Sequence, residues 1–416
     1  MARLGRSFGF LLSSTALSNL ADGVLKVGAP LLAVSLTRSP AQVALVGAAA
    51  TLPWLLFALP AGAIADRLDR RRIMVLANVA RAAVLVAAAA LGALGLMNLW
   101  IMLGAVLLAS VSEVFADIAA QSVLPMTVSP AHITRANGRV VSTQMIGNEF
   151  AGAPVAGLLV TLLPAAVFGA PGLLYGAAGL LLLGMRGRFL PRAESTGQRS
   201  MAGDIGEALR YLWAHRLLRT MAVSAGMLNL ASAAYFGVFV LWVVGEGSRM
   251  GMEPSSYGLV MTALAVGAVA GSLVSERVTR LVGEGRALVG LWLISALLYL
   301  VPVLLPIGWL LYPTAVVWGA TGAAANVLVV SARQRLIPAE LLGRVNSAYR
   351  LIAMGGMPIG AALGGVLGEF AGLPAVFLGA AAVCLAAVGL IWRVALDRIS
   401  SPLTSDTTIP DISRSR

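Results

Sequence analysis

Twelve apolar runs follow one another along the chain, each close to the length that crosses a lipid bilayer as a helix. Such a helix needs about 20 predominantly apolar residues. Only 12% of the 416 residues are charged, against about 25% in soluble domains. The sequence therefore predicts an all-α integral membrane protein with twelve transmembrane helices. The predicted spans are 9–36, 42–64, 73–96, 98–119, 139–163, 165–185, 217–245, 256–276, 286–305, 307–331, 346–369 and 372–394.

The arginines are distributed unevenly among the connections between these runs. If the N-terminus is cytoplasmic, the outside connections hold only Arg38 and Arg249, and the other loop arginines face the cytoplasm. Cytoplasmic loops are enriched in Lys and Arg. We therefore expect a multi-pass protein of the cell membrane with both termini cytoplasmic. This topology also accounts for the net charge of +12 without a nucleic-acid partner.

Several classes of enzyme are excluded by residues that the sequence lacks. Cys384 is the single cysteine, so we expect neither an intrachain disulfide nor a cysteine-based metal site. Lys26 is the single lysine and follows no glycine-rich loop, whereas a P-loop needs a lysine to reach the nucleotide phosphates. We expect a protein that is not an enzyme, binds no metal or cofactor and uses no ATP. Any work must draw on a gradient or on a partner.

Short segments recur along the chain at nearly one spacing. "NLAD" at 19–22 is matched by "NLAS" at 229–232, and "DRLDR" at 66–70 is matched by "ERVTR" at 276–280. Transporters with parallel repeats bind substrate near the bilayer midplane, between the repeats. The sequence predicts a first six-helix half (1–185), a cytoplasmic linker with a short amphipathic helix (186–216), a second six-helix half (217–395) and a disordered cytoplasmic tail (396–416).

The stretch "GAIADRLDRRRIM" at 62–74 resembles the signature of the major facilitator superfamily between its second and third helices, G-x-L-a-D-r-x-G-r-[rk]. Asp69 stands where that pattern has glycine. The D-R-x-D-R-R form, together with "LSNLADG" and "RQRLIPAELLGRVNS", resembles the branch of enterobactin exporters and macrolide-efflux proteins. The resemblance covers almost the whole chain. It implies the major facilitator fold and a proton-coupled exporter of amphipathic small organic molecules of the drug, macrolide or siderophore class.

The same signature predicts a cytoplasmic gate. Asp66 and Arg70 are one helical turn apart and can pair. In the family this pair is linked to an acid at the cytoplasmic end of the fourth helix, where we expect Asp117. Alternatively, the arginines only determine topology. The predicted gate residues are Gly62, Asp66, Arg67, Arg70, Arg71 and Asp117.

A second stretch, "GNEFAGAPVAG" at 147–157, resembles an antiporter pattern of the fifth helix, G-x(3)-G-P-x-x-G, with Ala153 as an extra residue. In the family the pattern marks exporters. Glycine allows close helix approach and proline frees backbone for a bend, so plain packing is the alternative. The residues that match are Gly147, Gly152, Pro154 and Gly157.

Charges inside the first span are the third functional signal. Asn19, Asp22 and Lys26 share one helix face, and Asp22 and Lys26 are one turn apart. We expect these two to pair, because a partnered buried charge costs far less than a lone one. The second half has Ser232 and Phe236 at these positions, so the fold itself does not require the charges. A purely structural ion pair remains the alternative.

Two further acids lie inside the spans of the first half. Burial favours the neutral form of a carboxyl group, so we expect Glu113 and Glu149 to bind and release protons. The second half has no acid deep in a span. We therefore predict proton coupling at Asp22, Lys26, Glu149 and Glu113. The predicted substrate cavity is formed by Asn19, Asn229, Tyr235, Phe236 and Phe239, with an apolar wall in the second half.

The expected partners are a small-molecule substrate, protons and the lipid bilayer. Within transport, the alternatives are an importer or a lipid flippase of the same fold. A sensor with a transporter fold is a further alternative, and it would show no proton-dependent flux.

Overall fold

The computed structural model describes residues 5–187, 189–190, 201–338 and 341–399. Within them, twelve helical segments are long and apolar enough to cross a membrane, which confirms the predicted fold class. The helices are α1 (Arg6–Leu36), α2 (Pro40–Ala65), α3 (Arg70–Ala93), α4 (Leu99–Thr127), α5 (Ile133–Met145), α6 (Gly152–Leu162), α7 (Ala166–Leu183), α8 (Met201–Ala214), α9 (Arg216–Val243), α10 (Pro254–Val282), α11 (Glu284–Leu298), α12 (Val301–Leu304), α13 (Leu311–Leu336), α14 (Leu342–Ala371) and α15 (Leu373–Ile399).

Some helices extend beyond their apolar runs. α4 continues to Thr127 although its run ends at residue 119, and α10 continues to Val282 although its run ends at residue 276. Apolar runs mark only the part of a helix that sits in hydrocarbon, so they miss polar turns outside it.

At the start of α3, the side chain of Asp69 accepts hydrogen bonds from the backbone N–H groups of Arg71 and Arg72. This N-cap gives Asp69 a structural role at the position where the superfamily pattern has glycine.

The fifth span is not a continuous α-helix. α5 passes into a π-helical turn, η2 (Ile146–Ala151), which passes into α6. A π-helix has i→i+5 hydrogen bonds and occurs mostly as single turns inside α-helices, frequently at functional sites. Glu149 lies within this turn. The fifth span therefore changes its helical phase close to one of the predicted proton-binding residues.

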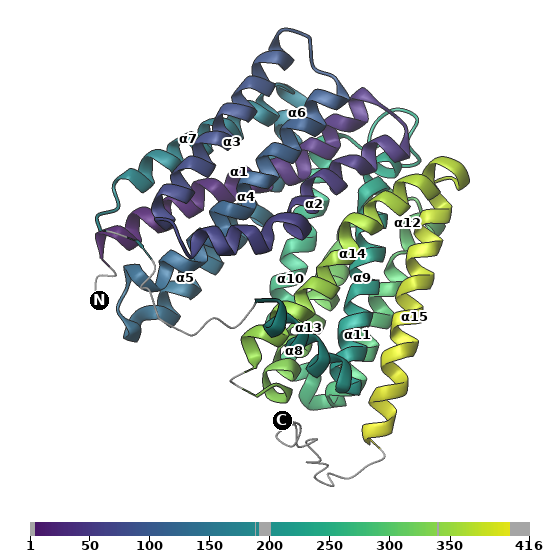
Figure 1. Ribbon diagram of the computed structural model, residues 1–416. Coiled ribbons are helices and arrows are strands. Elements are labelled where there is room, and N and C mark those ends of the chain that lie inside the picture. The colour runs from purple at the N-terminus through teal and green to yellow at the C-terminus, as the bar shows by residue number, and fades with distance from the viewer. Residues whose placement is uncertain (1–4, 188, 191–200, 339–340, 400–416) are drawn as a thin grey trace.

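The chain forms two bundles, α1–α7 and α9–α15, that touch at one end and diverge at the other (Figure 1). The touching end holds the connection between α1 and α2. There the Ser39 hydroxyl donates to Glu369 on α14 at 2.6 Å, and Arg38 donates to the carbonyl oxygens of Val244 and Glu246 at 3.1 and 2.9 Å. α1 begins and α15 ends at the diverging end (Figure 1). The ribbons of the two bundles therefore lie farthest apart at the end where the described chain begins and ends (Figure 1).

The linker contains the helix α8, within the predicted segment 186–216. Leu212 is fully buried in a cluster with residues of the second bundle, and the Tyr211 hydroxyl donates to the Leu336 carbonyl oxygen at 3.5 Å. α8 is therefore attached to the second bundle at the end where the bundles diverge. Of the predicted tail 396–416, residues 400–416 lie outside the described residues.

Candidate functional site

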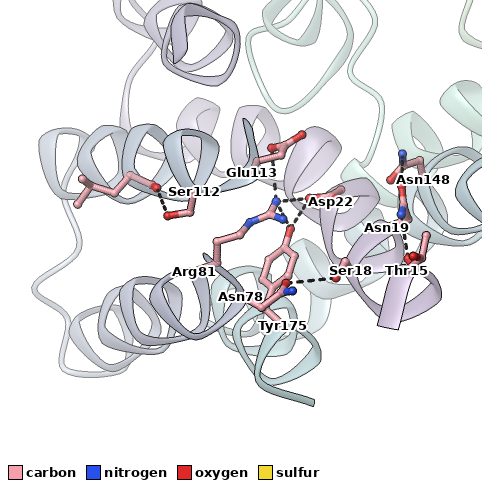
Figure 2. Close-up of polar contacts among 11 residues, drawn as sticks. Thr15, Ser18, Asn19, Asp22, Asn78, Arg81, Ser112, Glu113, Asn148 and Tyr175 are labelled. Carbon is pink, nitrogen blue, oxygen red and sulfur yellow. Dashed lines mark hydrogen bonds and ion pairs between the residues drawn. The ribbon is translucent and has the colours of Figure 1, made fainter. Parts of the chain in front are cut away.

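Four helices of the first bundle bring a guanidinium and several acidic or hydroxyl groups together (Figure 2). Arg81 on α3 donates through Nη2 to Asp22 on α1, to Tyr175 on α7 at 2.6 Å and to Glu113 on α4 at 3.4 Å. The Tyr175 hydroxyl in turn donates to Asp22 at 2.5 Å. Arg81 is 1% exposed, and its guanidinium carbon lies 3.8 Å from the centre of the Tyr175 ring. We call Asp22, Arg81, Glu113 and Tyr175 the Arg81 cluster.

The Arg81 cluster has more acidic groups than basic ones. Asp117 on α4, one turn after Glu113, is close enough to interact electrostatically with Asp22 and Arg81. Two carboxyl groups therefore contact one guanidinium, and a third lies near them. An unbalanced charge is costly to bury, and proton uptake by a carboxyl group would remove it. The arrangement is thus chemically suited to binding protons inside the first bundle.

Asp22 and Lys26 do not pair, so the predicted ion pair is wrong. Asp22 bonds Arg81 and Tyr175, whereas Lys26 Nζ lies 2.6 Å from Glu149 Oε1 in η2. The two residues are one turn apart on α1, but each has a partner on another helix. Asp22 finds the buried guanidinium of Arg81. The long lysine side chain instead reaches η2, and it is 62% exposed.

Arg81 and Tyr175 were not predicted from the sequence. Arg81 had a visible signal, because it is a charge inside the apolar run 73–96, and such charges in spans mark functional sites or paired groups. Tyr175 had none, since a tyrosine within a membrane helix most often packs. Its role follows only from the neighbouring Asp22 and Arg81.

The two asparagines predicted for the substrate cavity join helices. Asn19 is 8% exposed, donates to the Thr15 carbonyl oxygen at 2.8 Å and accepts from Asn148 in η2 at 3.0 Å. Asn229 on α9 donates to the Ala353 carbonyl oxygen on α14 at 3.0 Å. These amides satisfy buried polar groups at helix contacts, which is a structural role.

The predicted aromatic wall divides into two parts. Tyr235 is fully buried and packs among aromatic rings, 4.6 Å from Phe377 and 4.7 Å from Tyr299 between ring centres, so it lies in the core of the second bundle and does not line a cavity. Phe236 and Phe239, whose rings lie 5.5 and 4.9 Å from that of Tyr235 between centres, line a small apolar pocket. The other lining residues are Val260, Met261, Leu264, Pro302, Leu311, Thr314, Ala315 and Trp318.

The contacts predicted for the gate residues are present in part. Arg70 lies 3.5 Å from Asp66 and donates to the Ser122 carbonyl oxygen on α4 at 3.1 Å. Arg71 donates to the carbonyl oxygens of Leu182 and Leu183 at the end of α7. These two arginines tie the start of α3 to the ends of α4 and α7, where carbonyl groups favour cations.

Two other gate predictions have different outcomes. Asp117 does not lie at the end of α4, because α4 continues for ten further residues to Thr127; it interacts with the Arg81 cluster instead. Its predicted place was wrong because the apolar run ends at residue 119, well before the helix does. Arg67 and Gly62 lie at the end of α2, and a Cβ at Gly62 would meet open space.

The glycines of the fifth span allow close helix contacts. A Cβ on Gly147 would lie 2.9 Å from the Leu20 nitrogen, and one on Gly152 would lie 2.5 Å from the Gly23 Cα, both on α1. A Cβ on Gly157 would lie 2.8 Å from the Pro254 carbonyl oxygen on α10. The motif therefore packs η2 and α6 against α1 within the first bundle and α6 against α10 across the two bundles. Pro154 lies in the first turn of α6.

A family model described as "Transmembrane secretion effector" matches residues 5–412. The chain belongs to this family. It is a branch of the major facilitator superfamily, as the gate and fifth-helix motifs indicated. The chain is 28% identical over 398 residues to the multidrug efflux pump Tap of Mycobacterium tuberculosis (strain ATCC 25618 / H37Rv), and the match covers 92% of this chain and 91% of Tap.

A second relative matches part of the chain, and two solved structures share its fold. The chain is 30% identical over 169 residues to the enterobactin exporter EntS of Citrobacter koseri (strain ATCC BAA-895 / CDC 4225-83 / SGSC4696), and the match covers 39% of this chain and 38% of EntS. A bacterial homologue of the iron transporter ferroportin has a TM-score of 0.73 at 16% identity, covering 95% of this chain and 100% of its own. The nucleoside transporter NupG has a TM-score of 0.70 at 14% identity, covering 96% and 100%. These two structures show that the fold is that of a major facilitator transporter.

Proposed function

We propose that the protein is a proton-coupled exporter of amphipathic small organic molecules that works by alternating access in the cell membrane. The Arg81 cluster is the observation that carries this proposal. The matches to proteins named as a multidrug efflux pump and an enterobactin exporter support export.

Proton coupling rests on the charge balance of the cluster. Asp22 bonds both Arg81 and Tyr175 directly. Glu113 lies 3.4 Å from the same Arg81 nitrogen and its side chain is 28% exposed. A second carboxylate beside one guanidinium gains less than the first, so Glu113 is the group we expect to take up and release the proton. Asp117 is a second candidate on the same face of α4.

Alternating access rests on the contacts between the bundles. The bundles touch at the end of the α1–α2 connection and diverge at the opposite end (Figure 1). Loop arginines such as Arg70, Arg71 and Arg280 lie toward the diverging end, which the positive-inside rule assigns to the cytoplasm. This state would therefore receive substrate from the cytoplasm. Release on the outside would require the contacts of Ser39 with Glu369 and of α6 with α10 to separate.

Flux measurements in everted membrane vesicles test the proposal. A substrate is first identified by growth of a deletion strain across a panel of toxic compounds and chelators. Vesicles energised with a proton gradient should then accumulate that compound, and Glu113→Gln should abolish the accumulation at normal protein abundance. Glu276→Gln is the matched control, because Glu276 is an exposed acid of the second bundle that pairs with Arg280. A fully active Glu113→Gln variant would place coupling elsewhere.

The same assay separates the alternative functions. Gradient-driven accumulation in intact cells, with none in everted vesicles, would make the protein an importer. Movement of labelled lipid between leaflets, without flux of the selected compound, would make it a flippase. Compound binding without any proton-dependent flux would leave a sensor.

A further inference from the structure

Arg333, in the last turn of α13, is a second buried arginine, and no carboxylate contacts it among the described residues. It is 8% exposed, and its Nε and Nη1 atoms are enclosed without a hydrogen-bond partner. Its guanidinium lies over the Tyr349 ring of α14 at 3.8 Å, and Arg350, the next residue of α14, is close enough to repel it. A charge buried without a partner is costly. Arg333 therefore differs from Arg81, which two acids contact.

Arg333 shares one face of α13 with Ala315, Gly322 and Asn326, because these residues are separated by close to whole helical turns. Ala315 lines the small apolar pocket together with residues of α9 and α10, so this face points between those two helices. Further along the face, a Cβ on Gly322 would meet open space, and Asn326 is exposed although it lies within a membrane span. α13 therefore borders an opening between Ala315 and Arg333.

The sequence repeat places Asn326 at the position of Glu113. The stretch "QSVLP" at 121–125 recurs as "QRLIP" at 334–338, and the same spacing of 213 residues relates Glu113 to Asn326 and Ala120 to Arg333. The second half thus has an amide where the first has its candidate proton-binding acid, and an arginine where the first has alanine. An amide donates and accepts hydrogen bonds but carries no charge. Neither residue is required by the fold, since the first half lacks both, and this favours a role in recognition.

We propose that Asn326 and Arg333 bind the acidic group of the transported molecule, so that the substrates are amphipathic organic acids. The carboxylate would accept hydrogen bonds from the guanidinium and the amide, with the rest of the molecule in the opening before Gly322. A guanidinium–carboxylate bond is charge-assisted and therefore among the stronger hydrogen bonds. This inference rests on the proposed function and deepens it by naming the class of substrate.

The present contacts of Arg333 leave it free to turn toward a ligand. Because Nε and Nη1 have no partner, a rotation of the side chain into the opening breaks no hydrogen bond at these atoms and gives up only the contact with the Tyr349 ring. Such a contact is worth about 0.5–2 kcal/mol. Stacking on Tyr349 is thus the resting position of Arg333 while the site is empty.

Charge decides which class of molecule the site favours. Arg350 adds a second positive charge close to Arg333, so an organic cation would be repelled. An uncharged molecule would leave the buried guanidinium unbalanced, whereas a carboxylate would balance it. Glu113, the candidate proton-binding acid, lies in the other bundle, so the proton and the acidic substrate would occupy separate sites.

Equilibrium binding to the purified full-length protein in an uncharged detergent tests this site without any gradient. The two probes are 6-(dansylamino)hexanoate, which is anionic at pH 7, and 6-(dansylamino)hexanamide, which has nearly the same shape and no charge. The parent protein should bind the anionic probe about ten-fold more tightly than the amide probe. Arg333→Gln should lose this preference. The amide probe should bind both proteins equally, which also shows that the variant is folded.

Two further variants complete the test. Arg335→Gln is the matched control and should keep the preference, because Arg335 is in the same turn but is exposed and paired with Glu284 at 2.6 Å. Asn326→Asp places a negative charge in the opening and should weaken binding of the anionic probe alone. The inference is overturned if the parent protein shows no preference for the anionic probe, if Arg333→Gln retains it, or if Arg335→Gln loses it equally. None of these failures would bear on proton-driven export through Glu113, because the measurements involve no flux.

Discussion

Removal of the Arg81 guanidinium should destabilise the protein in a pH-dependent way. The substitution Arg81→Gln leaves Asp22 and Glu113 without the group that both contact. Loss of one partner of a buried ion pair costs about 3–5 kcal/mol, because the other charge stays buried. Asp22 keeps its hydrogen bond from Tyr175, which lowers the cost, whereas the second unpaired carboxylate of Glu113 raises it. We therefore expect a loss of about 3–5 kcal/mol in the free energy of unfolding at pH 8.

The loss should shrink as the pH falls toward 5. The folded variant then gains protons on its unpaired carboxyl groups and so binds more protons than the unfolded chain. Stability falls with rising pH wherever the folded state binds more protons, so the cost should be greatest at pH 8. With the charges gone, the lost hydrogen bonds remain, worth about 1–2 kcal/mol. The difference between the stability loss at pH 8 and that at pH 5 measures the contribution of the ion pairs.

Reversible denaturant unfolding in detergent, followed by the fluorescence of the eight tryptophans, measures both values. Arg333→Gln is the matched control. Arg333 on α13 is 8% exposed and lies 3.8 Å from the centre of the Tyr349 ring, much as Arg81 lies over Tyr175. Among the described residues no carboxylate contacts Arg333, so its loss should remove only the stacking on Tyr349, about 0.5–2 kcal/mol, and by the same amount at either pH. The reasoning is refuted if both variants lose the same free energy of unfolding, or if the loss in Arg81→Gln is the same at pH 8 and pH 5.

Three further predictions concern transport. Asp66→Asn should sharply reduce flux at normal abundance, whereas Glu276→Gln, at the matching position of the second half, should keep it; equal fluxes would leave the Asp66–Arg70 pair without a gating role. Gly258→Ala should block the α6–α10 contact, since its Cβ would lie 2.5 Å from a backbone oxygen, and should change cysteine crosslinking across that contact, unlike Gly104→Ala in open space. Tyr175→Phe keeps the ring beneath Arg81 but removes the bond to Asp22, so the pH profile of flux should shift; an unchanged profile would limit Tyr175 to packing.

The number and order of the spans could be predicted because each needs a long apolar run and the chain has few charges. Helix ends could not, since the turns beyond an apolar run leave no hydropathy signal. This error moved Asp117 from inside the first bundle to a predicted position at the end of α4. The predicted end of α4 differs from the observed end by only about two helical turns, but the difference assigned Asp117 to the wrong site.

The sequence predicted the acidic residues of the candidate site but not the residues that they contact. Asp22, Glu113 and Glu149 are each visible as charges within apolar runs, and all three lie at contacts between helices of the first bundle. Their partners could not be deduced, because spacing along one helix shows which residues share a face and not which neighbouring helix approaches it. Asp22 and Lys26 satisfied the spacing rule for a pair, yet contacts from α3 and η2 decide their actual partners.

The π-helical turn in the fifth span explains the extra residue in the antiporter-like motif. A ring closed by an i→i+5 hydrogen bond holds one more residue than an α-helical ring, so a single inserted amino acid can be absorbed without moving either end of the helix. The side chains before and after the turn then keep their orientations, and only those within Ile146–Ala151 are displaced. A one-codon insertion could thus redirect Glu149 in a single evolutionary step. Deletion of one residue from Ile146–Ala151 would reverse that step, and a comparison of relatives through this segment should allow a one-residue gap.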